Sequence, residues 1–110
     1  MSSYTAYEPS ALIGHYAITK TALVALTKLL AKELMDEGIR VNAIAPGLIK
    51  TKFSSVLWEK DEEESIKRMK VNRLGLPEDI ANVTHFLLST QSAYMTGECL
   101  AVAGKPISRL

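Results

Sequence analysis

The sequence lacks the features that mark disulfide-stabilised, membrane-spanning or nucleic-acid-binding proteins. Its 110 residues contain one cysteine, Cys99, which excludes an internal disulfide or a cysteine-based metal site and fits a reducing compartment. No apolar run approaches the ~18 residues that span a bilayer, and no charged-then-apolar leader opens the chain, so we expect neither a membrane span nor a secretory signal. The net charge of +1, with no basic stripe, argues against nucleic acid as the main partner.

Metal chemistry is not supported either. The two histidines, His15 and His85, have no acidic or cysteine partner at metal-ligand spacing, so no metal site is expected, although His15 could sense a substrate beside Tyr16. What remains is the composition of an ordinary globular protein, 47% hydrophobic and 23% charged. The length is enough for one domain.

The longest periodic segment predicts a helix over residues 13–37, ended by a left-handed Gly38. Its apolar residues form two neighbouring stripes, one of Leu23, Leu26, Leu30 and Leu34 and the other of Ala22, Ala25 and Leu29. Two stripes require two neighbours. We therefore expect a sheet on one side of the helix and another helix or a subunit on the other.

Two short apolar runs predict parallel strands. Residues 39–45 are β-branched and nearly continuously apolar after a helix, which is typical of a strand covered on both faces. Residues 98–103 form a second such run, in which Cys99 is expected to be a core residue. The order helix, strand, helix, strand predicts an α/β fold with part of a doubly wound parallel sheet. Residues 46–51 follow the first strand, where such sheets bind ligands, although an ordinary strand-to-helix turn fits equally well.

A charge-rich segment separates the first strand from the next helix. Residues 52–75 form an amphipathic insertion, and such insertions often serve as substrate lids. Trp58 and Met69 could touch a substrate there, but ordinary packing is the simpler expectation. The acidic run 59–64 is expected to be a solvated face. Pro77 begins a further helix, to about Ser89, whose buried stripe we expect to be Ile80, Val83, Phe86 and Leu87.

The main chemical signal lies at the start of the first helix. Residues four apart lie one turn apart on the same helix face, so Tyr16 and Lys20 should point the same way. A free tyrosine has a pKa near ~10, but a cation ~4 Å away favours the phenolate by about 4 kcal/mol at an effective dielectric constant of ~20. That cation could bring the pKa close to neutral pH, where general acid–base catalysis works best. Taken alone, the spacing fits an interfacial tyrosine beside a solvated lysine better.

Together with this order of elements, the residues resemble the short-chain dehydrogenase/reductase family. Four features agree in order and spacing: Ser2-Ser3, Tyr16 with Lys20, Arg40-Val41-Asn42 leading into Pro46-Gly47, and Thr96-Gly97 before the last strand. Ser3 lies 13 residues before Tyr16, which is the usual separation of the family's serine and tyrosine. The resemblance covers nearly the whole chain, residues 1–110, as the C-terminal part of a Rossmann-type doubly wound parallel sheet.

The resemblance implies an NAD(P)(H)-dependent enzyme that reduces small carbonyls or oxidises alcohols by hydride transfer. Tyr16 would donate a proton to the carbonyl oxygen during reduction and remove it during oxidation. Ser3 would hydrogen-bond that oxygen, with Ser2 as the fallback assignment. Lys20 would lower the tyrosine pKa and hold the nicotinamide ribose hydroxyls. The cofactor-binding residues it implies are Tyr16, Lys20, Pro46, Gly47, Ile49 and Thr51, with the Ile49 backbone and the Thr51 hydroxyl fixing the carboxamide.

Several details resemble the peroxisomal NADPH-dependent carbonyl reductase/retinol dehydrogenase branch of the family. They are residues 46–51, Leu57-Trp58, Arg73-Leu74-Gly75 and the ending Ser108-Arg109-Leu110. This ending resembles the Ser-Lys-Leu peroxisomal address, so we expect an exposed tail at 105–110 and a peroxisomal location, or otherwise a cytoplasmic one. NADP(H) is favoured over NAD(H) by the branch, not by any residue present.

A complete family member is well over twice this length. These 110 residues hold neither Gly-x-Gly-x-x-Gly nor Gly-x-x-x-Gly-x-Gly for a cofactor pyrophosphate, so the N-terminal dinucleotide-binding half is expected to be absent. An unpaired edge on strand 39–45 would make the isolated chain marginal, aggregation-prone or partner-dependent. Two function classes stay open. The chain is the catalytic half of an oxidoreductase, or it is a non-catalytic module whose helix 13–37 docks in a homo-oligomer or on full-length relatives.

Overall fold

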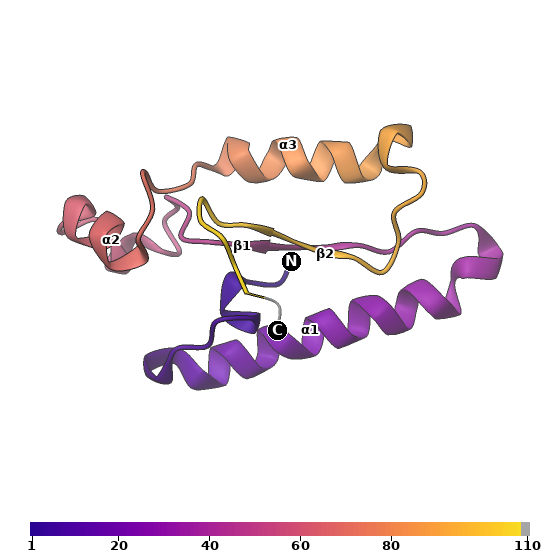
Figure 1. Cartoon of the computed structure of the whole chain (residues 1–110), viewed down its shortest axis with the longest axis horizontal. Helices are drawn as coiled ribbons and strands as arrows, with labels where there is room; N and C mark the ends of the chain where they lie inside the picture. Colours follow the sequence, from indigo (N-terminus) through magenta and orange to yellow (C-terminus); the bar gives the residue numbers. More distant parts are fainter. Residues whose placement is uncertain (109–110) are drawn as a thin grey trace.

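The computed structural model describes residues 1–108 and shows two parallel strands between two long helices (Figure 1). Strand β1 (Ala43–Pro46) pairs in parallel with strand β2 (Cys99–Val102). Helix α1 (Gly14–Glu33) covers one face of this sheet, and helix α3 (Pro77–Leu88) covers the other. The predicted α/β fold with a parallel sheet is confirmed.

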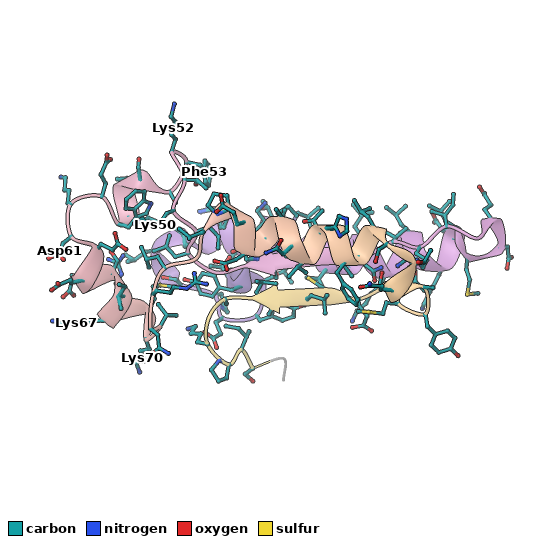
Figure 2. All side chains as sticks on the ribbon, turned by 90° about the horizontal axis from the view of Figure 1, so that it is seen from above. Lys50, Lys52, Phe53, Asp61, Lys67 and Lys70 are labelled. Atoms are coloured by element: carbon teal, nitrogen blue, oxygen red, sulfur yellow. The ribbon has the colours of Figure 1, made fainter. Side chains whose placement is uncertain are left out.

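Shorter elements connect these layers. Helix α2 (Glu62–Met69) lies at one end of the molecule, beyond the ends of the strands, and Figure 2 shows Lys52 and Phe53 projecting at that same end. Short 3-10 helices form the remaining turns: η1 (Tyr4–Ala6), η2 (Ala11–Ile13), η3 (Met35–Glu37), η4 (Ser55–Leu57) and η5 (Thr90–Ser92). Within residues 1–108, none of the helices combines the length and the apolar character that crossing a bilayer requires.

Helix α1 faces the sheet through small side chains. Its buried residues are Ala17, Thr27 and Ala31. Ala22, Ala25 and Leu29 of the second predicted stripe are all exposed, so this stripe has no covering neighbour among residues 1–108, and Leu26 of the first stripe is exposed as well. Helix α1 ends at Glu33, before the predicted residue 37, and the 3-10 helix η3 continues the chain to Gly38. Gly38 adopts the predicted left-handed conformation, with φ 71°, which few other residues tolerate.

The buried core is small and centred on the strands. Ala43, Ala45 and Cys99 form one buried cluster, and Val24 of α1 and Tyr7 pack against it. The expectation that Cys99 is a core residue is therefore confirmed. Such small side chains allow α1 to lie close to the sheet, and they bury little apolar area per residue.

Strand β1 is shorter at its start than the predicted 39–45. It begins at Ala43 because its partner begins only at Cys99, where Gly97 has just turned the chain with φ 74°. Before that point the contacts become irregular: Val41 N–H donates to the Thr96 hydroxyl at 3.1 Å, and Val41 O accepts from Gly97 N–H at 2.7 Å. The Thr96-Gly97 turn therefore sets where the sheet starts.

Arg40 holds the end of α3 on this turn. Its guanidinium donates to the carbonyl oxygens of Leu87 at 2.8 Å, Ser89 at 3.2 Å and Met95 at 3.0 Å. A cation placed there satisfies carbonyls that the helix itself leaves unpaired and opposes the negative end of the helix dipole. Asn42 adds a bond to the same Met95 oxygen at 2.9 Å. Arg40 and Asn42 of the Arg40-Val41-Asn42 motif therefore have structural roles.

Helix α3 begins at Pro77, as predicted. The Asp79 carboxylate accepts from Leu76 N–H at 2.7 Å and so pairs one of the free amides at the helix start. Leu87 is buried as expected, but the prediction that Phe86 is buried is wrong, because 36% of it is exposed. The two strands cover only part of the helix face, and Phe86 lies outside the covered part.

Candidate functional site

The candidate site lies where both strands end. The carboxyl ends of β1 and β2, the start of α1 and helix α2 all gather at one end of the molecule (Figure 1). Segment 1–3 reaches this region along β1, because Ser2 N–H donates to Ile44 O at 2.7 Å on the edge opposite β2. The edge of β1 that was expected to be unpaired therefore carries at least this one bond. Open parallel sheets bind ligands at this position.

Tyr16 and Lys20 occupy successive turns of α1 and face each other. The Lys20 ammonium lies 5.3 Å from the centre of the Tyr16 ring. The same ammonium donates to Met1 O at 3.2 Å, which fixes its position against segment 1–3. Both side chains are half-buried, so each keeps access to a ligand. The spacing in the sequence thus corresponds to a real contact.

The two adjacent serines make different contacts. The Ser2 hydroxyl donates to Lys20 O at 2.8 Å and ties segment 1–3 to α1. The Ser3 oxygen instead accepts from Thr5 N–H at 3.2 Å and from the Thr5 hydroxyl at 2.9 Å. A hydroxyl has two acceptor positions and one proton, so the Ser3 proton remains to be donated. Of the two, Ser3 is therefore the better donor to a substrate oxygen.

The turn after β1 is closely packed on the turn after β2. Gly47 N–H donates to Val102 O at 2.9 Å, and a Cβ at Gly47 would lie 2.8 Å from Ala103 Cα. Glycine is required there for that reason. Pro46 is the last residue of β1, opposite Val102. The close packing on Val102 and Ala103 explains why glycine follows Pro46 at the end of β1.

Ile49 is held in an extended bridge with Gly75. The bonds run through its neighbours, since Gly75 N–H donates to Leu48 O at 3.0 Å and Lys50 N–H donates to Gly75 O at 2.8 Å. In a parallel bridge the central residue directs its own N–H and C=O to the opposite side. Ile49 O accepts from the Ser54 hydroxyl, while Ile49 N–H has no hydrogen-bond partner among residues 1–108. That amide could bind an acceptor on a ligand.

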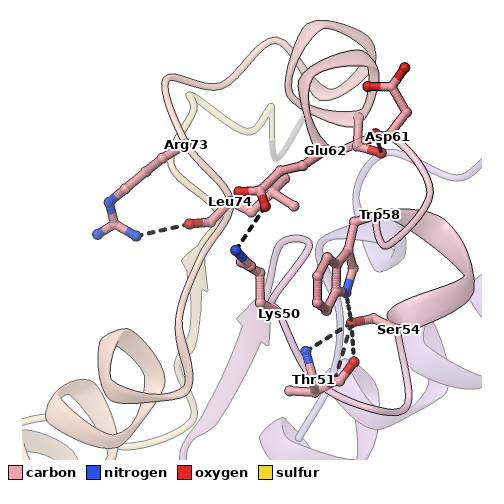
Figure 3. Close-up of polar contacts among 9 residues, drawn as sticks. Lys50, Thr51, Ser54, Trp58, Asp61, Glu62, Arg73 and Leu74 are labelled. Carbon is pink, nitrogen blue, oxygen red and sulfur yellow. Dashed lines mark hydrogen bonds and ion pairs between the residues drawn. The ribbon is translucent and has the colours of Figure 1, made fainter.

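Ser54 organises the turn that carries Thr51 (Figure 3). Its oxygen accepts from Thr51 N–H at 3.2 Å and from Trp58 Nε1–H at 3.0 Å. The Thr51 hydroxyl lies 3.2 Å from the same oxygen. Sequence reasoning missed Ser54. The signal that could have found it is the spacing Thr51-x-x-Ser54, because short hydroxyl side chains at such spacing bond to nearby backbone groups in turns.

The predicted lid is tied to this turn by an ion pair. The Lys50 ammonium lies 2.8 Å from a Glu62 carboxylate oxygen of α2 and 5.1 Å from the centre of the Trp58 ring (Figure 3). Ser65 of α2 donates to Leu57 O at 2.6 Å. Trp58 is thus packed among residues of its own segment, as the simpler expectation held.

A cavity of about 370 Å³ opens beyond the strand ends, lined by residues 47–49, 72–73, 75, 79 and 102–104. Gly47 and Ile49 belong both to this cavity and to the candidate cofactor segment. Arg73 and Asp79 pair across its rim at 2.7 Å. The Arg73 guanidinium holds the pKa of the Asp79 carboxyl well below its usual range, and the Leu76 amide adds to this effect.

Tyr4 is a second site residue that sequence reasoning missed. Its hydroxyl lies 3.6 Å from Met69 Sδ of α2, and the Lys105 ammonium lies 5.5 Å from its ring centre. Burial raises the pKa of the Tyr4 phenol, and the Lys105 charge opposes that rise. Tyr4 directly follows Ser3, so it joins segment 1–3 to α2 of the predicted lid. A tyrosine in a polar, irregular segment gave no periodic signal that could have identified it.

The segment expected to be an exposed tail is tied down at its first residue. Lys105 pairs with Glu8 at 2.7 Å, and its hydrogen bond is the largest cause that lowers the pKa of the Glu8 carboxyl. The Ser108 backbone lowers the same pKa. Pro106 and Ser108 are exposed. The last two residues of the ending that resembles a peroxisomal address lie outside the described residues.

Comparison with known proteins identifies the family. The family described as "Enoyl-(Acyl carrier protein) reductase" matches residues 1–104. Dehydrogenase/reductase SDR family member 4 of Homo sapiens is 50% identical over 112 residues, covering 100% of this chain and 40% of the relative. The chain therefore spans about two fifths of the length of the curated relatives that it matches.

Solved structures agree with this comparison. A 4-hydroxyisoleucine dehydrogenase complexed with NADH is 28% identical with a TM-score of 0.85, over 94% of this chain and 43% of that one. A candidate 2-deoxy-D-gluconate 3-dehydrogenase from Agrobacterium tumefaciens with bound NADP is 36% identical with a TM-score of 0.84, also over 94% and 43%. The layers, the parallel sheet and the sequence agree with these proteins. The chain belongs to the short-chain dehydrogenase/reductase family of oxidoreductases.

Proposed function

We propose that this chain is the catalytic and substrate-binding half of an NAD(P)(H)-dependent oxidoreductase that reduces carbonyls or oxidises alcohols. The observation that carries this proposal is the contact between Lys20 and Tyr16, with the ammonium 5.3 Å from the ring centre at the carboxyl ends of the strands. A bound nicotinamide supplies the hydride in this chemistry. The residues of this chain position the reactants and move the proton.

Tyr16 and Ser3 act on the substrate oxygen. During reduction, the Tyr16 hydroxyl donates its proton to the carbonyl oxygen, and during oxidation the phenolate accepts it from the alcohol. The Ser3 hydroxyl donates a hydrogen bond to that oxygen as negative charge develops. Its available proton supports this role, because the Ser3 oxygen already accepts two bonds from Thr5. Lys20 stabilises the phenolate by its charge and binds the ribose hydroxyls.

The segment after β1 fits the carboxamide of the cofactor. Ile49 N–H is available to donate to a carboxamide oxygen, since it has no partner among residues 1–108. The Thr51 hydroxyl, two residues further along the segment, bonds to the same group. Pro46 and Gly47 belong to the same proposed site, because Gly47 lines the cavity beyond the strand ends and Pro46 precedes it at the end of β1. Fixing the carboxamide determines which face of the nicotinamide ring meets the substrate.

The cofactor we propose is NADP(H), and the location is peroxisomal. Both rest on the resemblance to the peroxisomal carbonyl reductase branch, at residues 46–51 and at the Ser108-Arg109-Leu110 ending. The solved relatives include one with NADH and one with NADP. Peroxisomal import is tested by fusing residues 101–110 to a fluorescent protein, and loss of import on deletion of Leu110 is the expected result.

A chimera tests the proposed function. This chain replaces the corresponding 112 residues of the human relative, so that the remainder of a full-length family member precedes it. We expect the chimera to bind NADPH in a fluorescence titration and to consume it with small ketones. Failure of the folded chimera to bind NADPH at millimolar concentration would refute the proposal. The same titration on the 110-residue chain shows whether it works alone.

The exposed stripe on α1 favours a second candidate, a non-catalytic module that associates with other copies or with full-length relatives. Ile18, Leu26 and Leu29 are 70%, 45% and 52% exposed along one side of the helix. Leu26→Glu should shift the chain toward monomer in analytical ultracentrifugation, whereas the exposed Lys28→Glu, on the side of the helix away from Leu26, should not. If the stripe mediates association while the chimera shows no turnover, the module is the better description.

A further inference from the structure

We propose that Ser54 is a positioning residue that couples the lid to the cofactor-binding segment, a role that rests on the proposed function. Ser54 is buried, with 9% of its surface exposed. Its hydroxyl contacts Thr51 and the indole of Trp58 (Figure 3). The same hydroxyl donates to Ile49 O. The Ser54 oxygen therefore joins Ile49 and Thr51, the two residues assigned to the carboxamide, with Trp58 of the lid.

The hydrogen-bonding capacity of Ser54 is fully used. Its single proton is shared between the acceptors Ile49 O and, at 3.2 Å, Thr51 O, and its two acceptor positions take Thr51 N–H at 3.2 Å and Trp58 Nε1–H at 3.0 Å. A hydroxyl can do no more than this. The Thr51 hydroxyl, 3.2 Å from the same oxygen, is therefore not required there and can turn to a ligand. Ser54 thus fixes the backbone of the segment while leaving its functional groups available.

A second link runs in parallel with the first. The Lys50 side chain leaves the cofactor-binding segment between Ile49 and Thr51 and pairs with Glu62 in the first turn of α2 at 2.8 Å. The same ammonium lies 5.1 Å from the centre of the Trp58 ring. The indole is therefore held by Ser54 at its nitrogen and by Lys50 at its face. A displacement of the lid from the cofactor-binding segment must break the bonds of Ser54 to Ile49 and Thr51 and the contacts of Lys50 with Glu62 and Trp58.

Because of these contacts, residues 49–58 should move together. When a carboxamide binds Ile49 N–H and the Thr51 hydroxyl, it holds the same backbone that Ser54 holds for Trp58. A ligand stabilises the conformation that it binds better. A carboxamide that holds residues 49–51 in place should therefore also favour the position of Trp58 that Ser54 bonds. We expect cofactor binding at residues 49–51 to order Trp58 through Ser54. We also expect a change at Trp58 to alter the order of residues 49–51.

The single tryptophan of the chain gives a direct measurement. In a nitrogen–proton NMR spectrum, Trp58 contributes the only indole N–H signal, and Thr51 contributes its amide. Ser54→Ala should move the indole signal and speed hydrogen exchange of both groups by about two- to tenfold, the effect of losing one hydrogen bond. Ser55→Ala is the matched control. The Ser55 hydroxyl has no hydrogen-bond partner among residues 1–108, so neither group should change.

Trp58→Phe tests the coupling from the lid side and does not depend on the fold of the Ser54 variant. It keeps an aromatic ring but removes the Nε1–H donor. We expect faster exchange at the Thr51 amide, with the Gly97 amide and the melting temperature unchanged. An unchanged Thr51 amide would overturn the proposal. Adding NADP⁺ to the wild-type chimera tests the proposed function separately. If the Thr51 amide signal does not shift, cofactor binding at Thr51 is refuted. The link through Ser54 is then decided by the Ser54 and Trp58 variants.

Discussion

The ammonium of Lys20 and the ring of Tyr16 are 5.3 Å apart, and the same ammonium binds Met1 O at 3.2 Å. This second contact matters because a lysine side chain on a helix surface is otherwise free to sample many rotamers. Segment 1–3 also carries Ser3, whose oxygen accepts two bonds from Thr5. One lysine therefore positions both the tyrosine and the serine segment.

Replacing Lys20 with methionine should lower carbonyl turnover of the chimera on the order of 100-fold. The variant loses the charge beside the Tyr16 ring and the donor that we assign to the ribose hydroxyls, and a hydrogen bond to a charged group contributes about 1.5–3 kcal/mol. Methionine keeps most of the chain length and loses the charge. Steady-state kinetics with NADPH measure the effect. Lys28→Met, on an exposed position of the same helix, is the control, and equal losses in both variants would contradict a specific role for Lys20.

Thr51→Val should raise the Michaelis constant for NADPH about tenfold. Valine matches the shape of threonine but lacks the hydroxyl that we assign to the carboxamide, and one hydrogen bond to a ligand accounts for an effect of this size. The melting temperature should stay the same, because the Ser54 hydroxyl bonds Thr51 through its backbone N–H. An unchanged Michaelis constant for NADPH would remove Thr51 from the cofactor site.

Gly47→Ala should destabilise the chain by about 1–3 kcal/mol, the usual cost of overpacking. Its Cβ would lie 2.8 Å from Ala103 Cα, a backbone atom that cannot move independently. Gly14→Ala is the matched control. A Cβ there meets nothing within 4 Å and φ is −57°, so alanine should be neutral or stabilise by up to about 1 kcal/mol. Denaturant unfolding measures both, and equal effects would contradict the packing described.

Asp79→Asn should make the stability of the fold less dependent on pH in acidic solution. The pKa of Asp79 is lowered in the folded chain, first by the Arg73 hydrogen bond and then by the Leu76 amide. A carboxyl with a lowered folded-state pKa stabilises the fold above its unfolded value, near ~3.9, and this stabilisation is lost as the pH falls toward the folded value. Melting temperatures between about pH 2 and 6 should therefore depend less on pH in Asp79→Asn. Glu78→Gln, whose carboxylate has no hydrogen bond among residues 1–108, should behave like the wild type.

The elements with strong periodicity or clear end signals could be predicted from the sequence. The α1 helix, the left-handed turn at Gly38 and the start of α3 at Pro77 each follow from local chemistry, although α1 itself ends at Glu33 and a 3-10 helix leads to Gly38. Both strands were located by their apolar runs. The start of β1 was not, because it depends on the turn at Gly97, which lies far along the chain.

The candidate site divides in the same way. The contact between Tyr16 and Lys20 follows from helix geometry alone, so its spacing predicts it. Ser54 and Tyr4 lie in irregular segments, where no period relates sequence to position. The contact of Tyr4 with Met69 depends on how α2 packs against segment 1–4, and the bond of Ser54 with Trp58 depends on the irregular turn at 51–58. Sequence patterns therefore locate groups carried by regular elements better than groups carried by loops.

The proton-transfer role of Tyr16 is tested most directly by Tyr16→Phe in the chimera, with carbonyl turnover measured under saturating NADPH. Phenylalanine keeps the ring beside Lys20 and removes only the hydroxyl. The account predicts a loss of about 10²- to 10⁴-fold in turnover, the range for a general acid, with NADPH binding retained. Turnover equal to that of the unmodified chimera would contradict it.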